Sequence, residues 1–337
     1  MLTPCKSLSV GEPAYPVGCL GASEELPVLR DLPSRRKLTR INDLTRHVRV
    51  FLLLLLSPSG ILAAQSPAPA SINASPTPGQ TALPTANPAR PTFTNPADLP
   101  PAGYLQFEQG LVQAGASPGL DSQFSIGQVT KIAVAPRLML EFVSQPFAYS
   151  SAAQQTSRDA GDLDLAVQAV VVEKSGHRPT IAVNYQNVVR SGSAPNLDVG
   201  SSTRSAVLLI SGDIGLTHYD TNYIVSEQTL PNLPQPSLRR AQFGQTICLS
   251  HPLFAAHTGS RLSLSGELWH ETQPLPTADR RNRPVARANA VGALAALSYA
   301  FAPNLVADTA LNRGLTSTST TWQFLAGFTY LLPHRLW

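Results

Sequence analysis

The amino-acid sequence predicts an all-β protein, namely one antiparallel transmembrane β-barrel of about twelve strands, with ten to fourteen strands compatible with the pattern. Three observations lead to this fold class. Apolar and polar residues alternate along one segment after another, which is the period of a β-strand whose two faces meet different surroundings. Charged residues make up only 14% of the chain, against about 25% in ordinary soluble domains. No apolar run reaches the ~20 residues of a membrane-spanning helix.

The N-terminal part of the chain predicts secretion. Residues 46–64 combine basic residues, the short apolar run Phe51–Leu56 and a small-residue end at Ala63-Ala64, which are the parts of a signal peptide. We interpret the irregular extension, residues 1–45, as an over-extended gene start; a genuine long n-region is the alternative. The sequence therefore predicts export and localisation in a bacterial outer membrane.

A Pro-, Ala- and Thr-rich segment follows at residues 65–102. Ten of its 38 residues are Pro, and Phe93 is its one aromatic residue. Such a segment cannot bury enough apolar surface to offset the entropy lost on ordering. We therefore predict an extended or disordered periplasmic leader without chemistry of its own.

Residues 103–337 form the predicted barrel. In its clearest strands apolar side chains leave one face and polar side chains the other, and each is close to the ~9–11 residues that cross a membrane at a tilt. These strands lie within residues 103–112, 137–143, 162–172, 180–190 and 260–271. Weaker segments of the same kind and a closing strand bring the total to about twelve, and an even count returns both barrel ends to the periplasm.

The closing strand lies within Thr321–Trp337. One of its faces is almost wholly aromatic or aliphatic, from Trp322 to Leu332, as expected where a barrel meets lipid between two aromatic girdles. The run Gly327-x-x-Tyr330-x-Leu332 resembles the C-terminal signal of bacterial outer-membrane barrels. We therefore expect two partners for the exterior, outer-membrane lipid and the barrel-assembly machinery that receives this strand.

The connections also fit an outer-membrane barrel. Short turns are predicted around Pro136, residues 175–179, Gly212 and Pro303, whereas longer polar loops separate the strands at the other end. Periplasmic turns of such barrels are short and outer loops are long. The sequence therefore predicts short turns at the periplasmic end of the barrel and long loops at its outer end.

Strand parity directs eight charged side chains toward one interior. These lumen-lining candidates are Glu108, Arg137, Glu141, Asp162, Asp164, Arg190, Arg261 and Glu267. Mixed charges inside a barrel can line a pore that selects solutes. They can equally form a network of salt bridges and hydrogen bonds that fills the lumen, as side chains fill many small barrels. The sequence leaves both interpretations open.

Composition and motifs argue against several other classes. Residues 65–337 hold 17 Lys and Arg against 16 Asp and Glu, too little excess positive charge for a nucleic-acid partner. Cys248 is the one cysteine beyond the signal segment, so no disulfide framework or thiolate metal site is predicted. We predict no catalytic residue, no metal site and no cofactor, since His-Glu-x-x-His does not occur and nothing in the local spacing pairs a serine with a histidine.

The histidines and tryptophans of the predicted barrel are interpreted as structural residues without a catalytic or binding role. His218, His251, His257 and His270 are interpreted as loop and interface residues. The two tryptophans that lie within strands, Trp269 and Trp322, are interpreted as membrane-interface or packing residues.

Three stretches carry a resemblance to a known family. The opening Gly103–Gly110, the segment Arg137–Phe142 and the segment Ala160–Leu165 resemble the outer-membrane transporter-like family labelled "meta-pathway of phenol degradation". The likeness covers residues 103–337; the long N-terminus and the tail after Leu332 depart from it. It implies an outer-membrane barrel that takes up small solutes, often aromatic ones.

The predicted function is passive passage or binding of small solutes, aromatic or hydrophobic ones among them. The alternative is a non-transporting structural or binding barrel at the cell surface. A barrel hydrolase acting on lipid is a weaker third alternative.

Overall fold

The computed structural model describes residues 84–118, 120–152, 155–189, 203–229, 239–254, 261–273, 277–281, 283–285 and 288–337. The predicted extension, residues 1–45, the signal segment, residues 46–64, and the first part of the leader, residues 65–83, lie outside this part of the chain. Among the described residues there is no helix long and apolar enough to cross a membrane.

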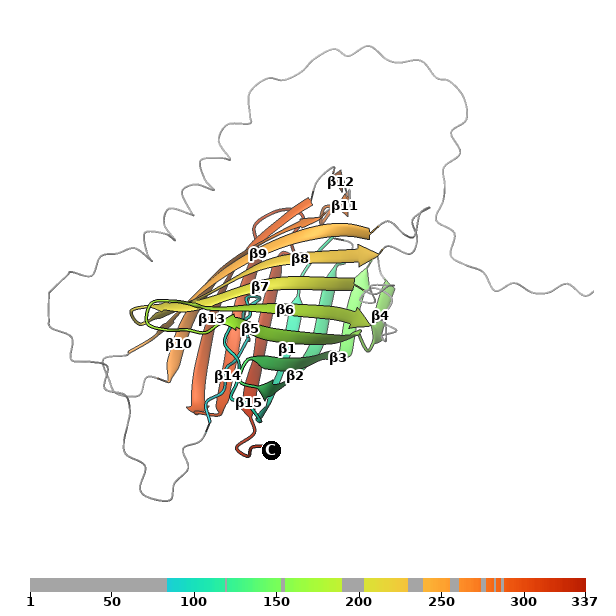
Figure 1. Ribbon diagram of the computed structural model, residues 1–337. Helices are drawn as coiled ribbons and strands as arrows, with labels where there is room; N and C mark the ends of the chain where they lie inside the picture. The colour runs from blue at the N-terminus through green and yellow to red at the C-terminus, as the bar shows by residue number, and fades with distance from the viewer. Residues whose placement is uncertain are drawn as a thin grey trace, which may run out of the picture. The chain divides into compact units, whose positions relative to one another are not determined.

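Twelve strands form a closed antiparallel barrel (Figure 1). They are β1 Leu105–Ala114, β2 Ser122–Ala135, β3 Leu138–Ala152, β5 Leu163–Val172, β6 Thr180–Val189, β7 Thr203–Ile214, β8 Thr217–Thr229, β9 Arg239–Pro252, β10 Leu262–Gln273, β13 Ala288–Ala302, β14 Leu305–Gly314 and β15 Trp322–Leu331. Each pairs with its neighbours in chain order, and β1 pairs with β15 to close the wall. The prediction of an antiparallel barrel of about twelve strands is confirmed.

Three short strands lie outside this wall. β4, Gln155–Asp159, extends β3 beyond the barrel, pairing Ala148 with Asp159. β11, Thr277–Ala278, pairs only with β12, Pro284–Val285, in the connection between β10 and β13.

The two ends of the barrel differ, as the sequence predicts. At the end that carries the start of β1 and the end of β15, three of the five connections are two-residue turns, at residues 136–137, 215–216 and 303–304. We call this the turn end. The opposite, loop end carries longer connections, including residues 190–202 and 274–287. Gly215 has φ of 63°, so the tight turn after β7 uses a backbone conformation that favours glycine.

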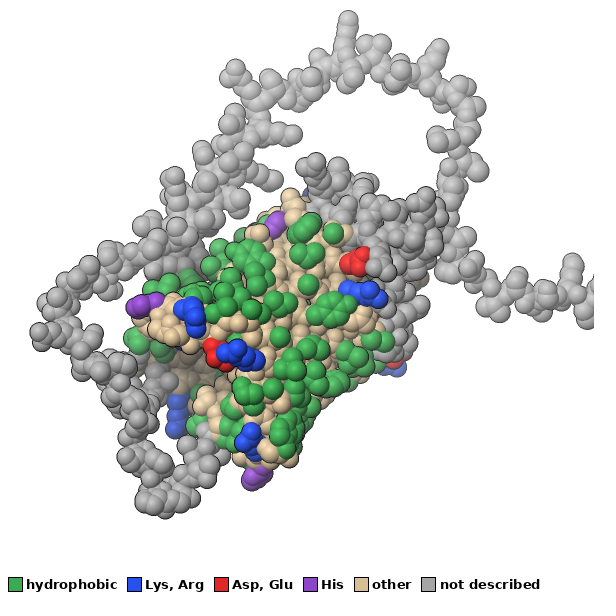
Figure 2. Space-filling view, viewed as in Figure 1, with side chains coloured by type: hydrophobic (Ala, Val, Ile, Leu, Met, Phe, Trp, Pro, Cys, Tyr) green, Lys and Arg blue, Asp and Glu red, His purple; other side chains and the backbone are tan. Residues whose placement is uncertain are grey.

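Alternation along the strands places apolar side chains on the outside of the barrel. On β15, Trp322, Phe324 and Phe328 are exposed, whereas Leu325 and Thr329, which point to the opposite face, are buried. Figure 2 shows hydrophobic side chains spread over the visible strands, with few charged ones among them. A continuous apolar exterior is what the strands of a membrane barrel present to lipid.

Residues 84–102 enter the barrel instead of lying beside it, and we call them the lumen segment. Ala97 is fully buried and packs with Ala182, Val207 and Leu209 of the barrel wall. This differs from the expected periplasmic leader. The segment has little apolar surface, but the polar interior of the barrel supplies hydrogen-bond partners that the composition of the segment does not reveal.

Candidate functional site

The inner wall of the barrel is polar and buried. Side chains from eleven strands contribute buried polar groups to it: Gln106, Glu108, Ser125, Lys131, Ser150, Gln168, Thr180, Asn184, Ser211, Asn222, Thr246, Ser265, Glu267, Asp308, Asn312 and Thr329. Buried polar groups are costly unless they are hydrogen-bonded. The lumen segment satisfies many of them.

The early part of the lumen segment contacts a charged cluster on β1 and β2. Glu108 accepts a hydrogen bond from Lys131 Nζ at 2.5 Å and one from Gln106 Nε2 at 2.9 Å. The amide of Ala89 donates to the same Glu108 oxygen at 3.3 Å, and the amide of Asn87 donates to Gln106 Oε1 at 2.9 Å. The lumen segment thus begins its course against a buried ion pair.

Glu267 on β10 holds the middle of the lumen segment. Its carboxylate accepts hydrogen bonds from the backbone amide of Phe93 at 2.8 Å and from Thr94 Oγ1 at 2.6 Å. Thr94 Oγ1 also lies 2.8 Å from Thr246 Oγ1 on β9. Because both carboxylate oxygens are bonded to the segment, Glu267 is a major anchor of it.

A row of glycines receives Arg90 of the lumen segment. Gly127, Gly110 and Gly327 lie side by side on β2, β1 and β15, and Gly327 pairs with Asp308 on β14. A Cβ atom at Gly110 would overlap the Arg90 guanidinium, and one at Gly327 would lie 2.8 Å from Arg90 Nε. The absence of side chains at Gly110 and Gly327 therefore makes room for Arg90.

The seat of Arg90 is incompletely hydrogen-bonded. Arg90 Nη2 donates to the carbonyl oxygen of Ala326 at 3.3 Å, and Arg90 Nε lies 3.9 Å from Asp308 Oδ1. Within the described residues, both Asp308 oxygens, Glu108 Oε2 and Thr329 Oγ1 are buried without a hydrogen bond. Partly satisfied buried polar groups lower the stability of a contact, so this seat holds the segment less firmly than Glu267 does.

The far part of the lumen segment is held on β5 to β7. Gln168 Nε2 donates to the carbonyl oxygens of Pro96 and Ala97, both at 3.1 Å. The amide of Ala97 donates to Ser211 Oγ at 2.7 Å, and Thr180 Oγ1 donates to Asp98 at 2.5 Å. The lumen segment therefore crosses the barrel and bonds to strands on opposite sides.

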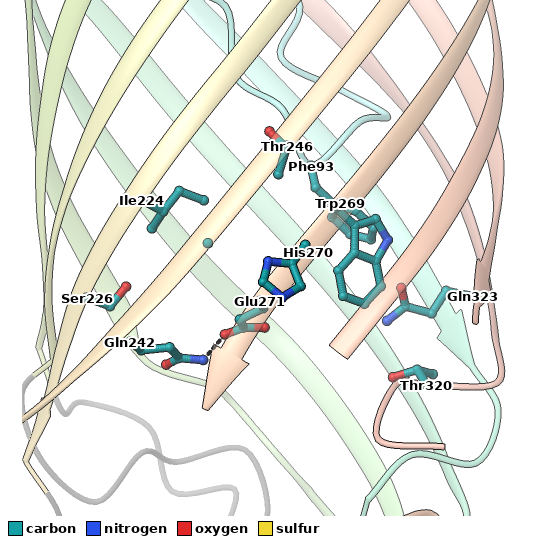
Figure 3. A pocket seen from close by; sticks show the side chains of 11 residues that line it. Phe93, Ile224, Ser226, Gln242, Thr246, Trp269, His270, Glu271, Thr320 and Gln323 are labelled. Carbon is teal, nitrogen blue, oxygen red and sulfur yellow. Dashed lines mark hydrogen bonds between the residues drawn. The ribbon is translucent and has the colours of Figure 1, made fainter. Parts of the chain in front are cut away.

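A cavity lies on each side of the lumen segment. One, which we call the loop-side cavity, has a volume of about 370 Å³ and is lined by Phe93 of the segment and by Trp269 and Glu271 of β10 (Figure 3). The other, the turn-side cavity, has a volume of about 270 Å³. It is lined by residues of the segment from Asn87 to Pro96 and by wall residues such as Ser263 near the turn end. The lumen segment therefore lies between these two cavities.

Four of the eight lumen-lining candidates lie on the inside of the wall. Glu108 and Glu267 contact the lumen segment as described above. Glu141 accepts a hydrogen bond from Asn184 Nδ2 at 3.3 Å, and Asp164 accepts one from Gln186 Nε2 at 2.7 Å. Gln186 lies on the strand paired with that of Asp164, and Asn184 lies two strands away from Glu141, so the carboxylates tie strands of the inner wall together.

The other candidates lie elsewhere. Arg137 occupies the exposed turn after β2 and donates to Glu173 Oε1 at 2.6 Å. Arg261 precedes β10 at the turn end, is exposed, and borders the turn-side cavity. Arg137 therefore does not join the inner wall, whereas Arg261 lines the lumen from its rim at the turn end. Asp162 precedes β5 and is half-buried, and Arg190 lies outside the described residues.

The Arg137–Glu173 pair has an electrostatic consequence at the turn end. The hydrogen bond from the Arg137 guanidinium lowers the pKa of Glu173, and the same bond raises the pKa of Arg137. Both side chains are exposed, so the pair contributes little to stability.

Several inner-wall groups are absent from the predicted set. The carboxylates are Asp220, Glu271 and Asp308, and the cation is Lys131. His218 also faces inward, with Nδ1 at 2.7 Å from Asp213 Oδ1 and Nε2 at 3.2 Å from Asp220 Oδ1, so its interpretation as a loop or interface residue is wrong. The alternation of His218, Asp220 and Asn222 with Tyr219 and Tyr223 is the signal that indicates this face.

The two strand tryptophans have different positions. Trp322 is exposed on the outside, with Arg313 4.4 Å above its ring, which fits an interface residue. Trp269 instead lies inside, where its Nε1 donates to Asn312 Oδ1 at 2.9 Å and its ring meets Phe93 edge-on at 5.8 Å. Trp269 is therefore a packing residue of the lumen.

No group of three or more His, Cys, Asp or Glu side chains within the described ranges is placed to hold a metal ion.

Comparison with known proteins gives likeness in fold alone. No family model matches the sequence, and none of the curated proteins does. The barrel is similar to a crystal structure of an outer membrane channel from Pseudomonas putida F1, with a TM-score of 0.53 and 12% identity over 73% of this chain and 100% of that one. Another similar structure is the NanC porin, with a TM-score of 0.48 and 8% identity over 67% of this chain and 98% of that one.

Proposed function

We propose that this chain is an outer-membrane channel for small solutes, aromatic or hydrophobic ones among them, and that the lumen segment closes it in the state described here. The observation that carries the proposal is the pair of cavities inside a polar wall, separated by a segment that belongs to the N-terminal side of the chain. Movement of one segment would join them into a path. Passage needs no covalent step, cofactor or metal.

The exterior supports the membrane part of the proposal. Large apolar side chains are exposed on strand after strand, from Phe142 on β3 to Phe328 on β15, far more than a soluble barrel would leave in water. The likeness in fold to an outer membrane channel agrees with this. The partners would be outer-membrane lipid, the barrel-assembly machinery acting on β15, and the solute, with no role for nucleic acid.

One observation favours a second candidate, a non-transporting structural or binding barrel. The lumen segment makes hydrogen bonds to side chains of β1, β5, β7 and β10. If all of them persist, the segment is a permanent part of the core and no solute passes. The two candidates therefore differ in whether the segment can leave.

A disulfide that joins the lumen segment to the wall, and that can be reduced again, distinguishes the two candidates. We call the double-cysteine variant that forms it the lock variant. Thr94 and Thr246 approach each other at 2.8 Å between hydroxyl oxygens, so Thr94→Cys with Thr246→Cys would join the segment to β9. Cys5, Cys19 and Cys248 would be changed to Ser in this variant and in its cysteine-free control. Conductance in planar bilayers would be recorded before and after addition of a reductant.

The channel proposal predicts discrete conductance steps for the reduced lock and for the cysteine-free control, and loss of these steps on oxidation. Equal conductance in both redox states would show that the segment does not close the path. A barrel that folds, judged by heat-modifiable migration in detergent gels, and never conducts would favour the second candidate.

A further inference from the structure

The loop-side cavity is built around an aromatic corner. Phe93 of the lumen segment and Trp269 of β10 meet edge-to-face there, with ring centroids 5.8 Å apart, and Ile224 adds an aliphatic wall. A volume of about 370 Å³ lies within the range of small-molecule pockets. The corner therefore offers aromatic and apolar surface to one small organic molecule.

Trp269 is held rigidly in this corner. Its indole Nε1–H donates to Asn312 Oδ1 at 2.9 Å. Its ring also lies where a side chain on the paired residue of β13, Gly292, would otherwise be, since a Cβ atom there would overlap the indole. A ring fixed on two sides loses little further entropy when a ligand binds to it.

A single charged group completes the cavity wall. Glu271 lies two residues after Trp269 on the same face of β10, and its carboxylate accepts a hydrogen bond from Gln242 Nε2 on β9 (Figure 3). Gln323 on β15 adds a second amide. Among the described residues, no Lys or Arg lines this cavity, and His270 beside Glu271 is its one basic side chain. The Glu271 carboxylate therefore stands near two aromatic rings without a permanently charged cationic partner.

One guanidinium lies close by without lining the cavity. Arg280 Nη1 donates to Thr321 Oγ1 at 3.1 Å, next to Thr320 at the cavity edge. It makes an anion the competing ligand class, and the test below includes one.

We propose that this cavity binds an organic cation that joins an ammonium group to an aromatic or compact apolar body. The ammonium would lie near Glu271 and against the face of an aromatic ring, where a cation is attracted by the ring quadrupole. The apolar body would fill the corner between Phe93, Trp269 and Ile224. This inference deepens the proposed function, since it names a solute class for the same lumen.

The test measures binding of three probes of similar size to the full chain folded in detergent. Benzyltrimethylammonium carries a positive charge, benzyl alcohol is neutral and phenylacetate carries a negative charge. Isothermal titration calorimetry gives the affinities. Tryptophan fluorescence reports the site directly in a Trp322→Phe, Trp337→Phe variant, in which Trp269 is the one remaining tryptophan of the three.

The proposal predicts saturable binding of benzyltrimethylammonium with a change in Trp269 fluorescence, and affinities for the other two probes roughly 5- to 30-fold weaker. Glu271→Gln and Trp269→Leu should each weaken binding of the cation by a similar factor. Glu173→Gln, which removes an exposed carboxylate at the turn end, should leave it unchanged.

Equal affinity for the cation and the neutral probe, or preference for phenylacetate, would overturn the proposal without any variant. Cation binding that neither Glu271→Gln nor Trp269→Leu weakens would place the ligand elsewhere and overturn it as well. Because binding is measured apart from conductance, a barrel that conducts but fails to bind the cation refutes this inference alone. A barrel that binds the cation but does not conduct refutes the channel proposal alone.

Discussion

At the scale of single residues, the glycine row offers the sharpest test of how the lumen segment is held. Gly110→Ala adds a Cβ atom that overlaps the Arg90 guanidinium, whereas a Cβ atom at Gly127, the next member of the row, meets nothing within 4 Å. Forcing an extra methyl into a filled space costs about 1–3 kcal/mol. We expect Gly110→Ala to displace Arg90 and to weaken docking of the segment by about that amount.

Hydrogen–deuterium exchange of residues 84–102 measures this effect. Exchange should accelerate in Gly110→Ala and stay close to the unsubstituted protein in Gly127→Ala, which changes the same residue type on the adjoining strand. Equal acceleration in both variants would indicate that a general loss of strand stability, and not Arg90, is responsible.

At the scale of elements, the sequence predicts strands far better than it predicts the lumen segment. Alternation is a local property, and it correctly turns Phe142 outward and Glu141 inward because each strand has lipid on one side and polar groups on the other. The fate of residues 84–102 depends on partners such as Gln168 and Glu267, which lie far away in the chain. The composition of a segment indicates how much apolar surface the segment can bury. It does not indicate which distant side chains will bind the segment.

The hairpin of β11 and β12 allows a prediction about pH. Asp279 accepts hydrogen bonds from the amide of Arg281 at 2.9 Å and from Arg283 Nη2 at 2.6 Å, and the Arg283 hydrogen bond is the main reason that the pKa of Asp279 falls to about 2. A carboxylate with a lowered pKa stabilises the folded hairpin above its ordinary pKa, near 3.8. That contribution is lost as the pH falls through about 2.

We therefore expect the hairpin to stay formed at pH 3 and to open near pH 2 (about the folded pKa of Asp279). Carboxyl carbon NMR of Asp279 gives the titration midpoint, and Asp279→Asn should open the hairpin at every pH. A midpoint near 3.8 would contradict the role assigned to Arg283.

At the scale of the whole molecule, the sequence predicts closure and strand number but not what fills the barrel. The interior charges differ in what surrounds them. Glu108 with Lys131 forms a buried pair in the wall, whereas Glu271 faces an open cavity. Strand parity places a side chain on the inner face. It does not show whether another segment of the chain meets it there.

The balance of charge inside the barrel predicts the ion preference of the open channel. The described inner wall carries an excess of carboxylates, namely Glu108, Glu141, Asp164, Asp220, Glu267, Glu271 and Asp308. Lys131 is the buried cation opposite them, Arg261 and His218 line the turn-side cavity, and Arg90 would leave with the lumen segment. Rings of carboxylates favour passage of cations, so we expect the reduced lock variant to conduct K⁺ in preference to Cl⁻.

Reversal potentials in a KCl gradient measure this preference directly. It should be strongest near 0.1 M salt, where charges act over about 10 Å, and weaker near 1 M, where they act over about 3 Å. Glu271→Gln should reduce it, because this carboxylate faces the cavity with no Lys or Arg among the described lining residues. Glu173→Gln at the exposed turn end should not. A preference for Cl⁻ at low salt would mean that the inner carboxylates do not border the conducting path, and solutes would then pass by another route than the one the two cavities mark.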